Sequence, residues 1–185
     1  MSGIKKKKPV KTVMIAVAAA AAIFAVLYYS GLFLPPYTVW HTLSIEGTGE
    51  GEPELIELKG RRVRVYDDGR VIFETPFFCR VSNMIYSDID RDGKRELTLL
   101  NYNIGEFGSR RPFWVKFDPP VYRQHIYIYR YRPQEKLMRP VWMASDIGVK
   151  AADFEKINED VIRITDRTGD ETNWMWISFG LRCVD

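Results

Sequence analysis

An uncharged apolar segment near the start of the chain divides this sequence into two parts. It runs for 23 residues, from Thr12 to Leu34, and Pro35 and Pro36 end it. A helix of that length crosses the hydrocarbon core of a bilayer with some tilt. The apolar region of a cleavable signal peptide is shorter, about 7 to 15 residues, although the alanine-rich centre here also resembles a cleavage region. We therefore predict a transmembrane anchor over residues 12–34.

The charges around this segment predict its orientation. Five lysines precede it within residues 1–11, and no acidic residue accompanies them. Because basic residues stay on the cytoplasmic side of a membrane helix, residues 1–11 are predicted to be a basic cytoplasmic tail. The chain is then a single-pass protein of the cell membrane. Its residues 37–185 form an extracytoplasmic domain.

The net charge of +3 comes from the tail and not from the domain. Five of the 27 basic residues are the tail lysines, which leaves 22 basic residues against 24 acidic ones in the rest of the chain. A nucleic-acid-binding domain needs a basic face, so no nucleic-acid partner is expected.

From about Tyr37 onwards the sequence is predicted to be nearly all β. Apolar and polar residues alternate in short segments, as at Val63 and Val65 between Arg62 and Arg64, which is typical of strands with one buried face. Turn residues separate these segments at short intervals. The predicted strands lie within 37–45, 55–58, 61–66, 71–74, 77–84, 96–102, 125–131, 137–144, 161–165 and 174–179, and residues 153–158 are either a short helix or an edge strand.

The length of the domain limits its architecture. A closed propeller needs at least four blades of four strands, and residues 37–185 supply about two and a half to three blades. We therefore predict an all-β fold, a compact antiparallel β-domain made of two blade-like sheets packed together. It is either a partial propeller or a sandwich.

Residues 88–96 are the most informative segment for chemistry. Three aspartates alternate with other residues, a glycine follows the third, and a glutamate stands three residues beyond the glycine. Gly93 allows a sharp turn, and carboxylates this close repel one another unless a cation lies among them. An all-oxygen site favours Ca²⁺. The predicted calcium ligands are the carboxylates of Asp88, Asp90, Asp92 and Glu96 and the backbone carbonyl of Lys94.

The loop does not fit an EF-hand, because its twelfth position is Leu99 where that motif needs a bidentate glutamate. It leads straight into a predicted strand that begins Glu96-Leu97. In this it resembles the calcium loops of FG-GAP or VCBS-type repeats, the units of integrin-α-like β-propellers. The preceding segment Val65–Phe73 resembles the hairpin before such a loop. Over residues 61–102 the resemblance implies a structural Ca²⁺ at a turn between blade strands. The alternative is an acidic turn without a metal.

Other candidate catalytic residues form no recognisable pattern. His41 and His125, the two histidines, stand within predicted strands. The serines lack the G-x-S-x-G context of a nucleophile elbow. An alternative function is an envelope glycan-processing hydrolase. In it, Glu171 and either Asp153 or Glu155 would act as acid and base across an aromatic cleft.

The aromatic residues and the cysteines leave further alternatives open. The tryptophans are interpreted as core residues of a small β-domain, with a platform for sugar rings as the alternative. Cys79 and Cys183 are predicted to form a disulfide, because the domain is expected outside the cytoplasm. The alternative is two free thiols. The five tryptophans are Trp40, Trp114, Trp142, Trp174 and Trp176.

The function expected from the sequence is a non-catalytic, membrane-anchored binding or scaffold module that Ca²⁺ stabilises. Its partners are then the membrane, through the N-terminal helix, and a protein or glycan that the sequence does not identify.

Overall fold

The computed structural model of this chain describes residues 9–49, 51–108, 111–144 and 147–184. It divides into two compact units, residues 1–34 and 35–185. Most of the predicted basic tail, residues 1–8, lies outside the described residues.

The first unit contains one helix, α1 (Pro9–Tyr29). Its segment Val10–Tyr29 has 20 residues and a mean hydropathy of 2.3, so it is long and apolar enough to cross a membrane. A signal sequence near an N-terminus has the same properties. The helix ends five residues before the predicted anchor does: Ser30–Leu34 form turns, with Gly31 at a φ of 78°. Glycine adopts this left-handed conformation readily, which explains why the helix stops here.

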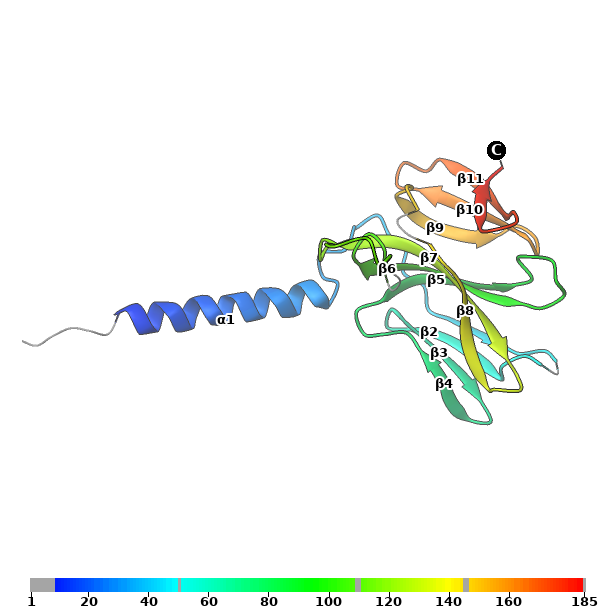
Figure 1. Cartoon of the computed structure of the whole chain (residues 1–185), viewed down its shortest axis with the longest axis horizontal. Helices are drawn as coiled ribbons and strands as arrows, with labels where there is room; N and C mark the ends of the chain where they lie inside the picture. The colour runs from blue at the N-terminus through cyan, green and yellow to red at the C-terminus, as the bar shows by residue number, and fades with distance from the viewer. Residues whose placement is uncertain (1–8, 50, 109–110, 145–146, 185) are drawn as a thin grey trace, which may run out of the picture. The chain divides into compact units, whose positions relative to one another are not determined.

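The described residues of the second unit form twelve strands in three antiparallel four-stranded sheets (Figure 1). Within each sheet, neighbouring strands are consecutive in the chain. The first sheet holds β1 (Leu43–Glu46), β2 (Leu55–Lys59), β3 (Arg62–Asp67) and β4 (Arg70–Glu74). The second holds β5 (Arg80–Ser87), β6 (Glu96–Ile104), β7 (Tyr122–Arg132) and β8 (Leu137–Met143). The third holds β9 (Ala151–Lys156), β10 (Val161–Asp166), β11 (Glu171–Trp176) and β12 (Leu181–Cys183).

The second sheet lies between the other two, so both of its faces are buried (Figure 1). Leu97 and Leu99 on β6 pack with the first sheet, in a core that also contains Val63 of β3. Leu100 of β6 faces the third sheet, in a core that also contains Phe154 of β9. Because successive side chains of a strand point to opposite faces, one continuous apolar segment supplies both cores.

The all-β, blade-like antiparallel fold predicted from the sequence is confirmed, with differences in detail. There are three sheets rather than two. Residues 153–158 contribute to a strand, β9, and not to a helix. The strand expected over 37–45 begins only at Leu43, and β12 was not predicted. The short β12 is a three-residue edge strand with little alternation, which explains why its sequence gives so weak a signal.

The first strands of the three sheets are neighbours: β5 contacts both β1 and β9. The fourth strands of the first two sheets, β4 and β8, also contact each other. β5 also contacts β2 and β3, so the first two sheets pack face to face through several of their strands. The predicted hairpin around Asp67–Gly69 is confirmed, but it closes the first sheet and not the sheet that carries the acidic loop.

The predicted disulfide is wrong, because Cys79 and Cys183 are both free. Cys79 is buried in the core between the first two sheets, and burial raises the pKa of its thiol to about 12. Cys183 is exposed on β12, at the edge of the third sheet. The middle sheet separates these two places, a separation that sequence spacing does not reveal.

Replacing Phe154 by alanine is expected to lower the free energy of unfolding by about 3–5 kcal/mol, because it opens a cavity between the second and third sheets. Phe179→Ala is the matched control, since that ring is 88% exposed. It should change the stability by less than about 0.5 kcal/mol. Urea unfolding of both variants measures the difference, and equal losses would contradict the assigned core.

Candidate metal centre

The acidic loop joins β5 to β6 and is held by its own backbone. The carboxylate of Asp88 accepts hydrogen bonds from the N–H groups of Asp92 (3.0 Å) and Gly93 (2.9 Å). The carboxylate of Asp92 accepts one from the N–H of Lys94 (3.0 Å). Ile89 is buried in the core between the second and third sheets. The apolar side chain therefore anchors the loop while the aspartates on either side remain near the surface.

Three of the predicted ligands form one cluster. Carboxylate oxygens of Asp88, Asp90 and Glu96, one from each residue, all lie within 4.8 Å of one another. This group can hold a metal ion. The side chains of Asp92 and Lys94 lie outside this cluster. Lys94 remains part of the predicted ligand set only through its backbone carbonyl.

Arg130 on β7 is the residue that the sequence reasoning missed. Its guanidinium donates to Glu96 Oε1 (2.6 Å) and to Asp90 Oδ2 (2.7 Å), and it pairs with Asp92 Oδ2 (2.8 Å). It lies directly opposite Glu96 in the β6–β7 register, 34 positions away in the chain. Nothing in the local sequence marks this arginine, because only strand pairing brings it to the loop.

The buried Glu96 has a strongly perturbed environment. Its side chain is fully buried, whereas that of Arg130 is 14% exposed. Burial raises the pKa of Glu96 to about 7, and the charge of Asp90 adds to the rise. Arg130 and the N–H of Ile89 act in the opposite direction. Burial also acts to lower the pKa of Arg130, but Glu96 and Asp90 outweigh it and the pKa lies above its usual value.

One oxygen in this centre has no hydrogen-bond partner. Asp90 Oδ2 accepts from Arg130, but Oδ1 of the same carboxylate is buried and unpartnered in the part of the chain that the structure describes. Leaving a buried acceptor unsatisfied costs about 1–3 kcal/mol. Such an atom is commonly explained by a bound ion or water.

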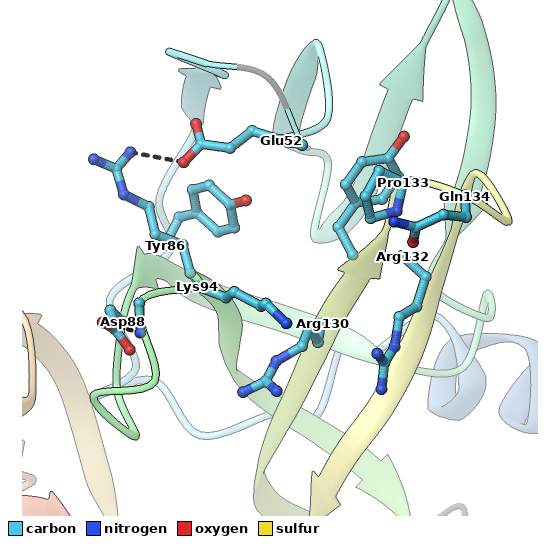
Figure 2. A pocket seen from close by; sticks show the side chains of 12 residues that line it. Glu52, Tyr86, Asp88, Lys94, Arg130, Arg132, Pro133 and Gln134 are labelled. Carbon is cyan, nitrogen blue, oxygen red and sulfur yellow. Dashed lines mark hydrogen bonds and ion pairs between the residues drawn. The ribbon is translucent and has the colours of Figure 1, made fainter.

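A pocket of about 510 Å³ opens beside the loop (Figure 2). Basic side chains from two elements line it, with Lys94 from the loop and Arg130 and Arg132 from β7. Figure 2 shows the Lys94 side chain extending toward Arg130. Glu52 lines another side of the pocket and pairs with Arg95 at 3.5 Å. The acidic centre therefore has a basic, solvent-accessible neighbour.

The carboxylates of the alternative hydrolase are engaged elsewhere. Asp153 accepts one hydrogen bond from Asn83 (2.7 Å) and lies 2.7 Å from His41 Nε2. Glu155 and Glu171 lie on either side of Arg163, at 3.7 and 3.2 Å from it. Both of these glutamates are more than half exposed. Each of these three carboxylates therefore already has a side-chain partner.

The tryptophans divide into two groups. Trp142, Trp174 and Trp176 pack against the core between the second and third sheets, as predicted for core residues. Trp142 and Trp174 also line a pocket of about 380 Å³ in which no described lining residue is acidic. Trp40 lies under the guanidinium of Arg61, at 4.1 Å. Trp114, by contrast, is 68% exposed.

The chain matches no known family model, no curated protein and no solved structure. The resemblance to FG-GAP or VCBS-type repeats therefore rests on the loop and its surroundings alone.

Gly93 has a φ of 85°, and a Cβ added there would meet nothing within 4 Å. Gly93→Ala should therefore cost about 1–2 kcal/mol of stability through backbone strain alone. Gly93→Val should cost more, because its β-branch further restricts the turn, and Gly93→Asn should cost less. Gly49→Ala is the control, since that position is equally open and has no left-handed φ. Equal melting temperatures for all four variants would contradict the predicted backbone strain at Gly93.

Arg130→Gln should lower the free energy of unfolding in chelator by about 3–5 kcal/mol, because it leaves Glu96 buried without its counter-charge. The double variant with Glu96→Gln should lose less than the sum of the two single variants. Arg139→Gln is the matched control: it lies opposite Arg130 on β8 and forms an exposed pair with Glu135. That change should cost less than about 1 kcal/mol. Additive losses in the double-mutant cycle would show that Arg130 and Glu96 are not coupled.

Proposed function

We propose that this chain is a non-catalytic extracytoplasmic module, held at the cell membrane by α1, whose acidic loop binds Ca²⁺. The unpartnered Oδ1 of Asp90 is the observation on which the metal part of the proposal rests. It belongs to one of the three carboxylates that converge within 4.8 Å. A cation that binds through Asp90 Oδ1 would satisfy that atom and offset the repulsion between the carboxylates.

The charge balance of the centre supports a divalent cation in addition to Arg130. Among the described residues, Arg130 is the one basic side chain that pairs with the loop carboxylates. Arg91 pairs instead with Asp160, and Arg95 with Glu52. A single guanidinium therefore faces the carboxylates of Asp90, Asp92 and Glu96, with Asp88 close by.

The donor set favours Ca²⁺ over softer metals. All the available ligand atoms are oxygens, whereas zinc sites are usually built from Cys and His ligands. Histidine and cysteine are absent from residues 88–96. Oxygen ligands on an irregular loop also suit Ca²⁺, which accepts irregular geometry, better than Mg²⁺, which demands a near-ideal octahedron.

The arrangement of the sheets supports a structural role for the ion. The loop connects β5, which contacts the first strands of both neighbouring sheets, to β6 in the middle of the second sheet. Through Arg91 it also contacts Asp160, in the turn between β9 and β10 of the third sheet. An ion here stabilises the turn between β5 and β6, the structural role that the FG-GAP or VCBS resemblance implies, and with it the contact to the third sheet.

Calcium is expected to stabilise the protein by about 1.4 kcal/mol, for about 1 mM free Ca²⁺ and a Kd of about 0.1 mM. The melting temperature should rise by several degrees. Asp90→Asn should abolish this increment and still give a folded protein, because Arg130 keeps its contacts with Glu96 and Asp92. Scanning calorimetry of both proteins, with calcium and with chelator, measures this change in melting temperature.

Glu135→Gln is the control for that experiment, because Glu135 is an exposed carboxylate outside the loop and pairs with Arg139. It should keep the full response to calcium. Identical melting of the unmodified protein in calcium and in chelator, with no heat on titration, would show that Arg130 alone neutralises the loop.

A further inference from the structure

Large aromatic side chains gather at the tip of the segment between β6 and β7. The N–H of Val115 donates to the carbonyl of Pro112 (3.0 Å), which closes a turn with Phe113 and Trp114 at its centre. Phe113 is 95% exposed and Trp114 is 68% exposed. Phe117 follows at 73%. We call residues 111–118 the aromatic loop.

The aromatic loop is held in place. At its end, the carboxylate of Asp118 accepts hydrogen bonds from the N–H groups of Glu106 (2.7 Å) and Phe107 (3.3 Å). The N–H of Gly105 donates to the carbonyl of Val121 (2.9 Å) at its base. These hydrogen bonds close the base of the aromatic loop. Its rings therefore stay exposed although burying them would remove apolar surface from water.

The base of the aromatic loop lies beside Pro35, the first residue of the β-domain. A pocket of about 640 Å³ is lined by Pro35 and Tyr37 together with Tyr102 and Tyr122, which stand near the end of β6 and at the start of β7. Thr38, which donates its N–H to the carbonyl of Pro35, also bonds Tyr102 Oη at 2.7 Å. Pro35 follows Leu34 in the chain, so this end of the domain stays within a few residues of the membrane segment.

Basic residues surround the same point. Arg123, Lys150 and Arg167 are exposed and line the pocket that contains Pro35, where Glu106 is the single acidic lining residue among those described. In the aromatic loop itself, Arg111 and Lys116 are exposed on either side of the turn. Aromatic rings with flanking basic residues are typical of protein surfaces at a lipid interface, where the rings lie among the headgroups and the cations contact anionic lipids.

We propose that the aromatic loop inserts into the bilayer interface and that the basic residues around Pro35 contact anionic lipid headgroups. The chain would then contact the membrane twice, through α1 and through this surface of the β-domain. This inference rests on the proposed role of α1 as a membrane anchor. The contact fixes the orientation of the domain to the bilayer, which a single helix with a short connection does not fix.

The test uses the full chain reconstituted into vesicles of phosphatidylcholine and phosphatidylglycerol that include a bromine-labelled phosphatidylcholine. Helix α1 contains no tryptophan, so quenching by bromine reports on the β-domain alone. We expect the unmodified protein to be quenched and Trp114→Phe to lose most of that quenching. Trp174→Phe, a change at a half-buried ring, should keep it. Arg111→Gln combined with Lys116→Gln should weaken the dependence of quenching on phosphatidylglycerol.

Two controls separate the possible outcomes. Flotation of the vesicles after alkaline carbonate treatment tests the anchor: a chain that does not float overturns the proposed anchoring and this inference with it. A chain that floats but shows equal quenching with and without Trp114 overturns this inference alone. A third outcome is a chain that shows no quenching, cross-links as a dimer in detergent and becomes monomeric on Phe113→Ser. A second copy would then cover the aromatic loop, and the proposed membrane contact would be wrong.

Discussion

The burial of the middle sheet on both faces is the constraint on which the rest of the domain depends. Antiparallel sheets commonly keep one face in water, but every residue of β6 except the last is buried. Its apolar side chains alternate between two cores, and polar ones such as Thr98 and Asn101 are buried with them. The outer sheets cover these two faces, so neither of them can be removed without exposing apolar surface of the middle one.

The same constraint explains the acidic centre. Glu96 and Arg130 lie opposite each other at the end of the β6–β7 ladder, on the face where Leu100 and Ile128 enter the core toward the third sheet. A carboxylate there loses its water and needs a counter-charge. Arg130 supplies part of that charge, and it holds the loop aspartates at the same time. The centre therefore combines a buried ion pair with a carboxylate cluster that can hold a metal ion.

Two surface regions of the domain differ in the side chains that they expose. Near the acidic loop the surface has mixed charges and a basic pocket, which suits polar ligands. Around Pro35 and the aromatic loop it has exposed rings and basic residues, which suits a lipid surface. If α1 anchors the domain as we propose, the aromatic surface serves the membrane and the acidic centre remains available to polar ligands.

The sequence by itself determined the local features: the apolar helix, most of the strands, and the acidic loop between β5 and β6. These depend on side-chain periodicity and on turn residues, which are local properties of the chain. It did not determine how the strands divide into three sheets, that Cys79 and Cys183 lie apart, or that Arg130 meets Glu96. Arg130 and Glu96 are 34 positions apart in the chain and meet, whereas Cys79 and Cys183 are 104 positions apart and do not. Only the packing of the sheets brings such distant residues together or separates them. The spacing of Asp88 and Asp90 indicates a candidate metal site from the sequence because that spacing is local. Arg130 reaches the same site through strand register, which exists only in the folded domain.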